Sequence, residues 1–204
     1  FDFARWSGGG QILPFFSRRI GLAGGMPQRI DFGAKLTGQV GAFDVGALQM
    51  RTGEVGLNPG EDFSVFRGRR RFFQESYVGG IYTRRSTRPS SVNPGVPDDR
   101  HTAGVDFYIG TSRFRGNRNI QFSGFFLWNN HPTLPDEGSA HYGFRFDYPN
   151  DRWTVRAGLR EVGAAYDPAI GFFDRRGIRR GDFAFYFQPR PKNNKRVRRY
   201  TFGT

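Results

Sequence analysis

Hydrophobic and polar side chains alternate along much of this chain. In RIDFGAKLTGQVG (29–41), Phe32 and Val40 fall on even positions, whereas Asp31 and Lys35 fall on odd ones. An extended strand points successive side chains to opposite faces, so a period of two predicts one apolar and one polar face. The pattern leaves open whether the apolar face meets a protein core or lipid.

The same alternation recurs in later segments, and no stretch has the period of an amphipathic helix. We therefore predict an all-β chain. The expected strands lie near 29–41, 45–53, 61–72, 77–85, 101–113, 119–129, 139–148, 152–166, 178–188 and 196–204. The third of them fits least well, because Phe63 and Val65 share their parity with Arg67 and Arg69. A β-bulge, which shifts parity by one residue, would restore the alternation.

The connections between these strands alternate in length. Short turns are expected at 42–44, 73–76, 114–118 and 149–151, and longer loops at 54–60, 86–100, 130–139 and 167–177. The joint at 189–195 is intermediate and is expected to be a turn. In up-and-down order all long loops lie at one end, which is typical of outer-membrane barrels and not of Greek-key sandwiches. We predict an antiparallel up-and-down transmembrane β-barrel of about ten strands, or the N-terminal part of a larger one.

Composition admits two classes of function. The 204 residues include 23 Phe and 29 Gly, no Cys, and a net charge of +13 that comes almost entirely from Arg. Cations and rings together are typical of nucleic-acid-binding surfaces, and also of barrels with aromatics toward lipid and charge toward a wet lumen. Because Arg and aromatic residues largely segregate to opposite faces of the strands, we favour the barrel and regard nucleic acid as the weaker alternative.

Arginines on the expected polar face could not face lipid, where each costs roughly 2–4 kcal/mol near the midplane. We expect them, together with one lysine, to face the lumen. The candidates are Lys35, Arg51, Arg67, Arg69, Arg84, Arg145, Arg156 and Arg160. Two roles stay open: they select anionic or polyhydroxylated solutes, or they pair with Asp31, Asp106, Asp147 and Glu161 and fill the interior.

Several stretches resemble one bacterial family. They are SGGGQILPFFSRRIGL (7–22), AKLTGQVGAFDVGALQMRTGE (34–54), FSVFRGRRRF (63–72) and REVGAAYDPAIGFFDRRGIRRGDFAFYFQPRP (160–191). The family is that of uncharacterised outer-membrane β-barrels that usually follow a module like carbohydrate-binding family 9. The resemblance implies a bacterial outer-membrane location and an association with glycans. No such module precedes FFSRRIGL here, and the barrels of the family are longer, so we expect the first strands of a larger barrel.

Residues 1–28 are expected to form a linker or plug-like segment ahead of the strands at 29–204. Within it, Arg18 and Arg19 either dock against the lumen or a preceding domain, or are simply solvated. Since the chain begins at Phe1 with no leader ahead of it, we expect a processed product or a fragment.

Catalysis finds little support in the sequence. His101, His131 and His141 lack metal-ligand spacing, and no Ser lies in a nucleophile elbow. We expect no enzyme activity, cofactor or metal. The expected function is passive transport or surface glycan handling through an Arg-rich lumen, with membrane lipid, glycans, small polar or anionic solutes and other membrane-complex subunits as partners. The alternatives are a structural barrel subunit and a basic nucleic-acid-binding β protein.

Overall fold

The computed structural model describes residues 1–4, 12–90, 98–192 and 196–204. It is all-β apart from one short 3-10 helix, η1 (Ser17–Arg19). The strands are β1 (Leu22–Ala23), β2 (Met26–Pro27), β3 (Ile30–Val40), β4 (Phe43–Thr52), β5 (Glu61–Phe72), β6 (Ser76–Thr87), β7 (Asp99–Phe114), β8 (Arg118–Asn129), β9 (Ala140–Pro149), β10 (Trp153–Val162), β11 (Ile178–Phe187) and β12 (Phe202–Gly203).

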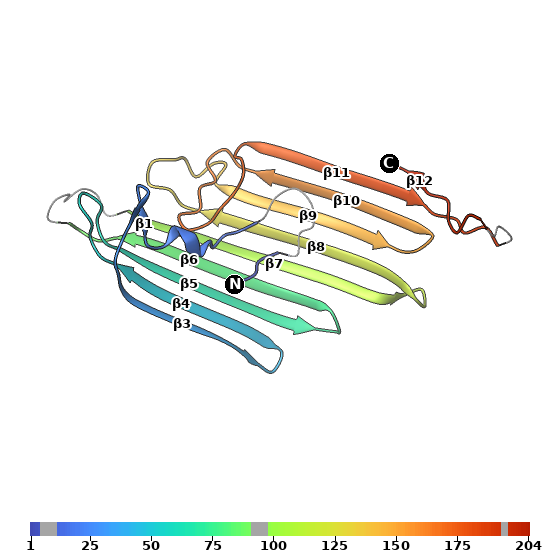
Figure 1. Ribbon diagram of the computed structural model, residues 1–204, viewed down its shortest axis with the longest axis horizontal. Coiled ribbons are helices and arrows are strands. Elements are labelled where there is room, and N and C mark those ends of the chain that lie inside the picture. The colour runs from blue at the N-terminus through green and yellow to red at the C-terminus, as the bar shows by residue number, and fades with distance from the viewer. Residues whose placement is uncertain (5–11, 91–97, 193–195) are drawn as a thin grey trace.

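Strands β3 to β12 form one antiparallel sheet in which each strand pairs with its neighbour in sequence (Figure 1). The prediction of an all-β, up-and-down chain is confirmed, and the first nine expected strands match β3 to β11 within a few residues at most of their ends. The tenth, expected at 196–204, contracts to the two residues of β12. The expected turn at 189–195 lies partly outside the described residues.

The sheet has two dissimilar ends. At one end, which we call the turn end, β3–β4, β5–β6, β7–β8 and β9–β10 are joined by tight turns. At the other, the loop end, the connections are longer, and Figure 1 shows them gathered together. The sheet is open, because its edges β3 and β12 do not pair with each other. Among the described residues, no helix is long and apolar enough to cross a membrane.

The register assigns each strand residue to one of two faces. Leu36 aligns with Ala47, Phe66, Tyr82 and Ala103 across five strands, and this series continues over the whole sheet. We call their side the apolar face. The other side, which carries Phe63, Val65 and Leu127, is the covered face.

The core lies on the covered face, near the loop end. Phe63, Val65 and Leu127 from the strands pack with Ile12 from the N-terminal segment and Ile170 from the β10–β11 loop. The N-terminal segment and this loop also pair by backbone, since Phe16 N donates to Ile170 O. Figure 1 shows both segments lying on one side of the sheet. The chain thus covers the loop-end part of one face of the sheet and leaves the other face bare.

The bulge expected in the third strand is wrong. β5 keeps an unbroken register with both neighbours from Asp62 to Arg70. Phe63 and Val65 do share a face with Arg67 and Arg69, because the covered face changes character along its length. Near the loop end it meets the apolar N-terminal segment, and nearer the turn end its arginines meet carboxylates.

Candidate functional site

The apolar face exposes large hydrophobic side chains from every strand of the sheet. Leu36 is 68 % exposed and Phe183, eight strands away, is 65 % exposed. The other exposed members on the face include Phe32, Val40, Phe43, Val45, Phe66, Val78, Val105, Ile109, Phe122, Phe126, Trp128, Phe144, Trp153, Leu159, Phe185 and Phe202. Exposed apolar patches of this extent are rare on soluble monomers and mark protein–protein or membrane contacts.

This apolar band ends in a polar belt at the loop end. Arg51 bonds Asp62 at 2.7 Å across β4 and β5, and Arg84 bonds Asp99 at 2.7 Å across β6 and β7. Further along, Glu161 Oε2 accepts from Tyr142 at 2.8 Å and from Arg179 at 2.7 Å. Because cross-strand pairing neutralises each charge, the belt forms a polar border to the apolar band.

The extent of the band along a strand can be read from β8. Its apolar-face residues Ile120, Phe122, Phe126 and Trp128 cover eight residue steps, or about 26 Å at 3.3 Å per residue along the strand. Outer-membrane barrels carry an apolar band of about 25 Å on tilted strands. A strand that crosses a bilayer has about 9–11 residues at a tilt near 45°, so the nine positions from Ile120 to Trp128 are about the length of one such strand.

Six of the eight expected lumen residues lie on the covered face: Lys35, Arg67, Arg69, Arg145, Arg156 and Arg160. The expectation that all eight share one face is wrong for Arg51 and Arg84. Both align with apolar-face residues and belong to the polar belt. They tolerate that face because they lie at the loop-end border of the band and are ion-paired.

The covered face holds a buried ion pair between Arg67 and Asp106. Arg67 Nη1 lies 2.6 Å from Asp106 Oδ1, and the two side chains are 7 % and 0 % exposed. The pair also binds the N-terminus, because Ala4 N donates to Asp106 Oδ2 at 2.9 Å and Arg67 Nε donates to Asp2 O at 3.1 Å. The N-terminal segment is thus tied to the sheet by charge as well as by apolar packing.

A glycine makes this pair possible. Arg67 and Asp106 belong to β5 and β7, and β6 lies between them with Gly79 opposite Asp106. A Cβ on Gly79 would lie 2.6 Å from Arg67 Nη1 and 2.9 Å from Gly68 O. The missing side chain leaves a gap through which the guanidinium reaches over one strand to the next.

The same arrangement recurs farther along the sheet. Gly158 on β10 aligns with Arg145 on β9 and with Asp182 on β11. A Cβ on Gly158 would lie 2.7 Å from Asp182 Oδ1, and Arg145 Nη1 is 3.9 Å from Asp182 Oδ2. Sequence reasoning missed both constellations, because only the register of three strands brings the arginine, glycine and aspartate together.

This geometry predicts that Gly79→Val destabilises the sheet by roughly 1–3 kcal/mol, since the new side chain overpacks the gap and displaces Arg67. The adjacent Gly80→Val is the matched control. Gly80 faces the apolar side, where its Cβ would meet nothing closer than 3.6 Å. Urea unfolding of both variants in the same detergent measures the difference; equal effects would contradict the role assigned to the gap.

Three more of the expected lumen arginines, Arg69, Arg145 and Arg156, also have carboxylate partners on the covered face. Arg145 and Arg156 both bond Asp147, at 2.8 and 3.0 Å. Arg69 bonds Asp44, a residue that the sequence analysis did not single out, at 2.8 Å. The pairs of Arg67 with Asp106 and of Arg145 and Arg156 with Asp147 agree with the second of the two roles left open above, in which the arginines pair with carboxylates. The other two expected acidic partners pair elsewhere: Asp31 with Arg29, and Glu161 within the polar belt.

Two further covered-face cations meet rings. Lys35 Nζ lies 5.8 Å from the centre of the Phe1 ring. Arg160 Nε donates to His141 Nε2 at 2.9 Å in a buried contact. That imidazole accepts at Nε2 and is therefore neutral, with its proton on Nδ1.

Arg18 and Arg19 of η1 are exposed. The neighbouring Phe16 packs on Phe172 with ring centres 5.7 Å apart, so the segment is held by its aromatic residues. Over the described ranges of the chain, neither arginine has a carboxylate within ion-pair distance. Both guanidinium groups lie on the solvent side of the N-terminal segment.

Asp167 joins three loop-end segments. Its carboxylate lies 2.9 Å from Arg100, 2.8 Å from Arg176 and 3.4 Å from His131. The adjacent Tyr166 is fully enclosed in the core, and burial raises the pKa of its phenol. This cluster orders the loops over the covered face. No spacing of residues in the sequence predicts it.

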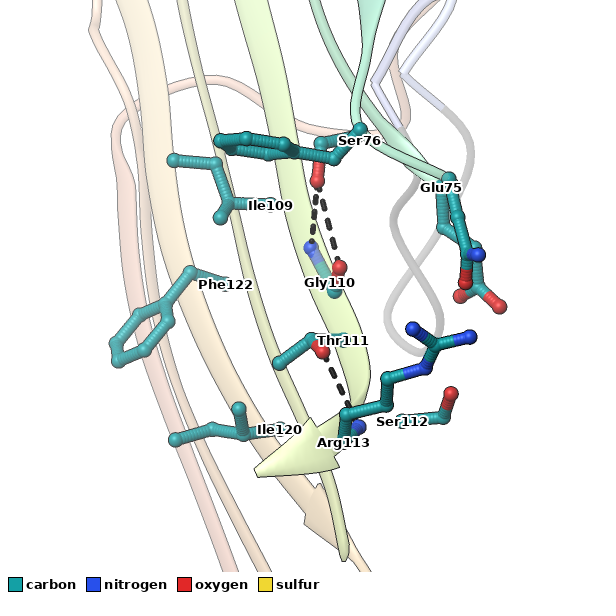
Figure 2. A pocket seen from close by; sticks show the side chains of 11 residues that line it. Glu75, Ser76, Ile109, Gly110, Thr111, Ser112, Arg113, Ile120 and Phe122 are labelled. Atoms are coloured by element: carbon teal, nitrogen blue, oxygen red, sulfur yellow. Dashed lines mark hydrogen bonds between the residues drawn. The ribbon is translucent and has the colours of Figure 1, made fainter. Parts of the chain in front are cut away.

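A hollow of about 540 Å³ lies at the turn end, between the β5–β6 turn and the longer β7–β8 hairpin. Ser76 Oγ closes the β6 ladder by accepting from Gly110 N at 3.1 Å (Figure 2). Figure 2 shows Ile109, Ile120 and Phe122 on one side of the hairpin and Arg113 on the other. The hollow therefore joins an apolar wall to a charged rim.

The described residues contain no group of three His, Cys, Asp or Glu side chains that could hold a metal ion. Comparison with protein-family models, with curated proteins and with solved structures finds no match to this chain.

Proposed function

We propose that this chain forms part of the wall of a bacterial outer-membrane β-barrel. In this proposal the apolar face contacts lipid and the covered face lines an interior through which polar or anionic solutes, glycans among them, pass. The observation that carries the proposal is the continuous apolar band across the sheet, bordered by the ion-paired belt of Arg51, Asp62, Arg84 and Asp99. A soluble protein would have to hide such a band.

Closure of the barrel is part of the proposal. Backbone groups at a sheet edge find no water in lipid, so a stable membrane sheet needs both edges paired. β3 and β12 are the edges of the described sheet. Further strands or another subunit would pair with them, in keeping with either a larger barrel or a structural role in a membrane complex.

Electrophoresis of detergent-extracted protein tests the membrane assignment. A membrane barrel unfolds only on heating and so migrates differently with and without boiling. A single position under both conditions, with full solubility in the absence of detergent, would overturn the assignment.

Conductance across a planar bilayer tests the lining. Arg69 and Arg156 balance Asp44 and Asp147 on the covered face. Replacing both arginines by Gln removes two positive charges from the covered face, so we expect the reversal potential in a KCl gradient to shift toward cation preference. The matched control is Arg51→Gln with Arg84→Gln, which removes the same charge from the apolar face. An equal shift in both variants would contradict a lumen on the covered face.

A further inference from the structure

The two ends of the sheet differ in charge. The cations in the turns and strand ends of the turn end are Arg70, Arg71, Arg113, Arg115, Arg118, Arg152, Arg190, Lys192, Arg196, Arg198 and Arg199. The carboxylates there are Asp44, Glu75 and Asp151. Most of the net charge of +13 therefore lies at the turn end, whereas the loop end is rich in both signs.

With Arg196 left aside, most of these cations have no carboxylate at ion-pair distance among the residues that the structure describes. Arg71 approaches Asp44 at 3.5 Å and Arg190 approaches Asp151 at 2.5 Å. Within the part of the chain that the structure describes, Arg115, Arg152 and Arg199 have no carboxylate at ion-pair distance. Arginines with no internal partner, gathered at one border of an apolar band, are suited to an external anion.

Aromatic rings on the apolar face hold several of these cations at the border. Arg70 lies 5.7 Å from the centre of Phe43, and Arg152 lies 5.7 Å from the centre of Phe187. Arg118 Nη1 donates to Tyr148 Oη at 3.4 Å. The guanidinium groups are thus placed where the apolar band ends and water begins.

The aromatic border is densest beside the β11–β12 connection. Trp153 stacks on Phe187 with ring centres 4.2 Å apart, and Phe202 continues the row toward Tyr200. Amphipathic rings favour the headgroup level of a bilayer, and nearby basic residues are attracted to anionic headgroups. Arginine in particular matches phosphate geometry with paired hydrogen bonds.

We propose that the turn end binds the headgroups of anionic phospholipids. The inference rests on the proposed membrane function and adds the lipid class and the surface that recognises it. The connection between β11 and β12 supplies five of the eleven cations, Arg190, Lys192, Arg196, Arg198 and Arg199, and the arginine–ring pairs supply the contacts at the border.

The turn-end hollow supports the same assignment. Phe73 at the tip of the β5–β6 turn is 88 % exposed and has a φ of 52°, a conformation rarely adopted by bulky residues. Residues with such backbone strain cluster at active sites and ligand-binding sites. Phe73 lines the hollow together with Ile109, Ile120 and Phe122, an apolar wall that fits an acyl chain beneath a bound headgroup.

The test is flotation of the full chain with two kinds of vesicle, phosphatidylcholine alone and phosphatidylcholine mixed with phosphatidylglycerol. The variant carries Lys192→Gln, Arg198→Gln and Arg199→Gln. Its control carries Arg18→Gln, Arg19→Gln and Arg175→Gln, which remove the same charge from exposed positions at the loop end. We expect the turn-end variant to lose roughly 10–100-fold of its preference for anionic vesicles, and the control to keep it.

An equal loss in both variants, or no preference in the unaltered chain, would overturn the inference. Stronger binding to single-stranded DNA than to anionic vesicles would assign the basic end to nucleic acid instead. Flotation reads lipid binding whether or not the chain inserts, while the heat-dependent gel shift reads insertion. Failure of the lipid preference is therefore distinguishable from failure of the proposed barrel.

Discussion

Replacing Phe122 and Phe183 together by Arg is expected to abolish the stable, heat-shifted form of the protein in lipid or detergent. The register places both residues at the same level within the apolar band, in line with Phe146 and Ala157. Each Arg at the midplane of a bilayer costs about 2–4 kcal/mol. The two together approach the whole stability of an ordinary domain.

The control for this prediction uses the same face outside the band. Ser86 and Gln49 lie near the polar belt, where Asp62 and Asp99 are close in register. Arginine at these two positions should be tolerated. Urea unfolding followed by the gel shift measures both variants. If the Phe122→Arg, Phe183→Arg protein were as stable as the control, the apolar face would not contact lipid, since exposed substitutions in water usually change stability by under about 0.5 kcal/mol.

Asp106→Asn is expected to destabilise the folded protein by about 3–5 kcal/mol, because it leaves the buried guanidinium of Arg67 without its counter-charge. Both carboxylate oxygens of Asp106 accept hydrogen bonds, one from Arg67 and the other from Ala4 N. An Asn has only one acceptor oxygen, so the N-terminal segment should also become accessible to protease. Urea unfolding and limited proteolysis of the same samples provide the two measurements.

Two further variants test whether the loss of stability comes from burial of the Arg67–Asp106 ion pair. Asp151→Asn removes the partner of Arg190, where the side chains are 59 % and 63 % exposed, and should cost less than about 1 kcal/mol. The double variant Arg67→Met, Asp106→Leu removes both charges and should recover most of the lost stability. If the double variant were no better than Asp106→Asn, the loss would come from packing and not from an unpaired charge.

The alternation of side chains was enough to place most of the strands. A period of two is a local property, and Gly-rich turns such as that at Gly41 interrupt it visibly. The prediction of a tenth strand at 196–204 was wrong for most of its length, because this segment has no regular alternation and pairs with β11 only at its last residues. Phe125 and Leu127, which break the alternation of β8 in sequence, proved to be core residues of the covered face.

The candidate surfaces could be predicted only in part. The separation of arginines from aromatics could be predicted from the parity of their positions along each strand. The placement of Arg51 and Arg84 at a border could not. Their placement depends on distance from the strand end, and on carboxylates that neighbouring strands supply. The link from Arg67 across Gly79 to Asp106 depends on the register of three strands at once.

The amino-acid sequence by itself determined the class of structure, the course of the strands and the separation of long from short connections, because these follow from neighbours along the chain. Tertiary structure decided which apolar residues became core and which stayed bare. The N-terminal segment and the β10–β11 loop cover only one face, so Phe63 is enclosed while Phe66, three residues later, remains exposed. Burial is a property of what packs against a side chain, and no local pattern contains that information.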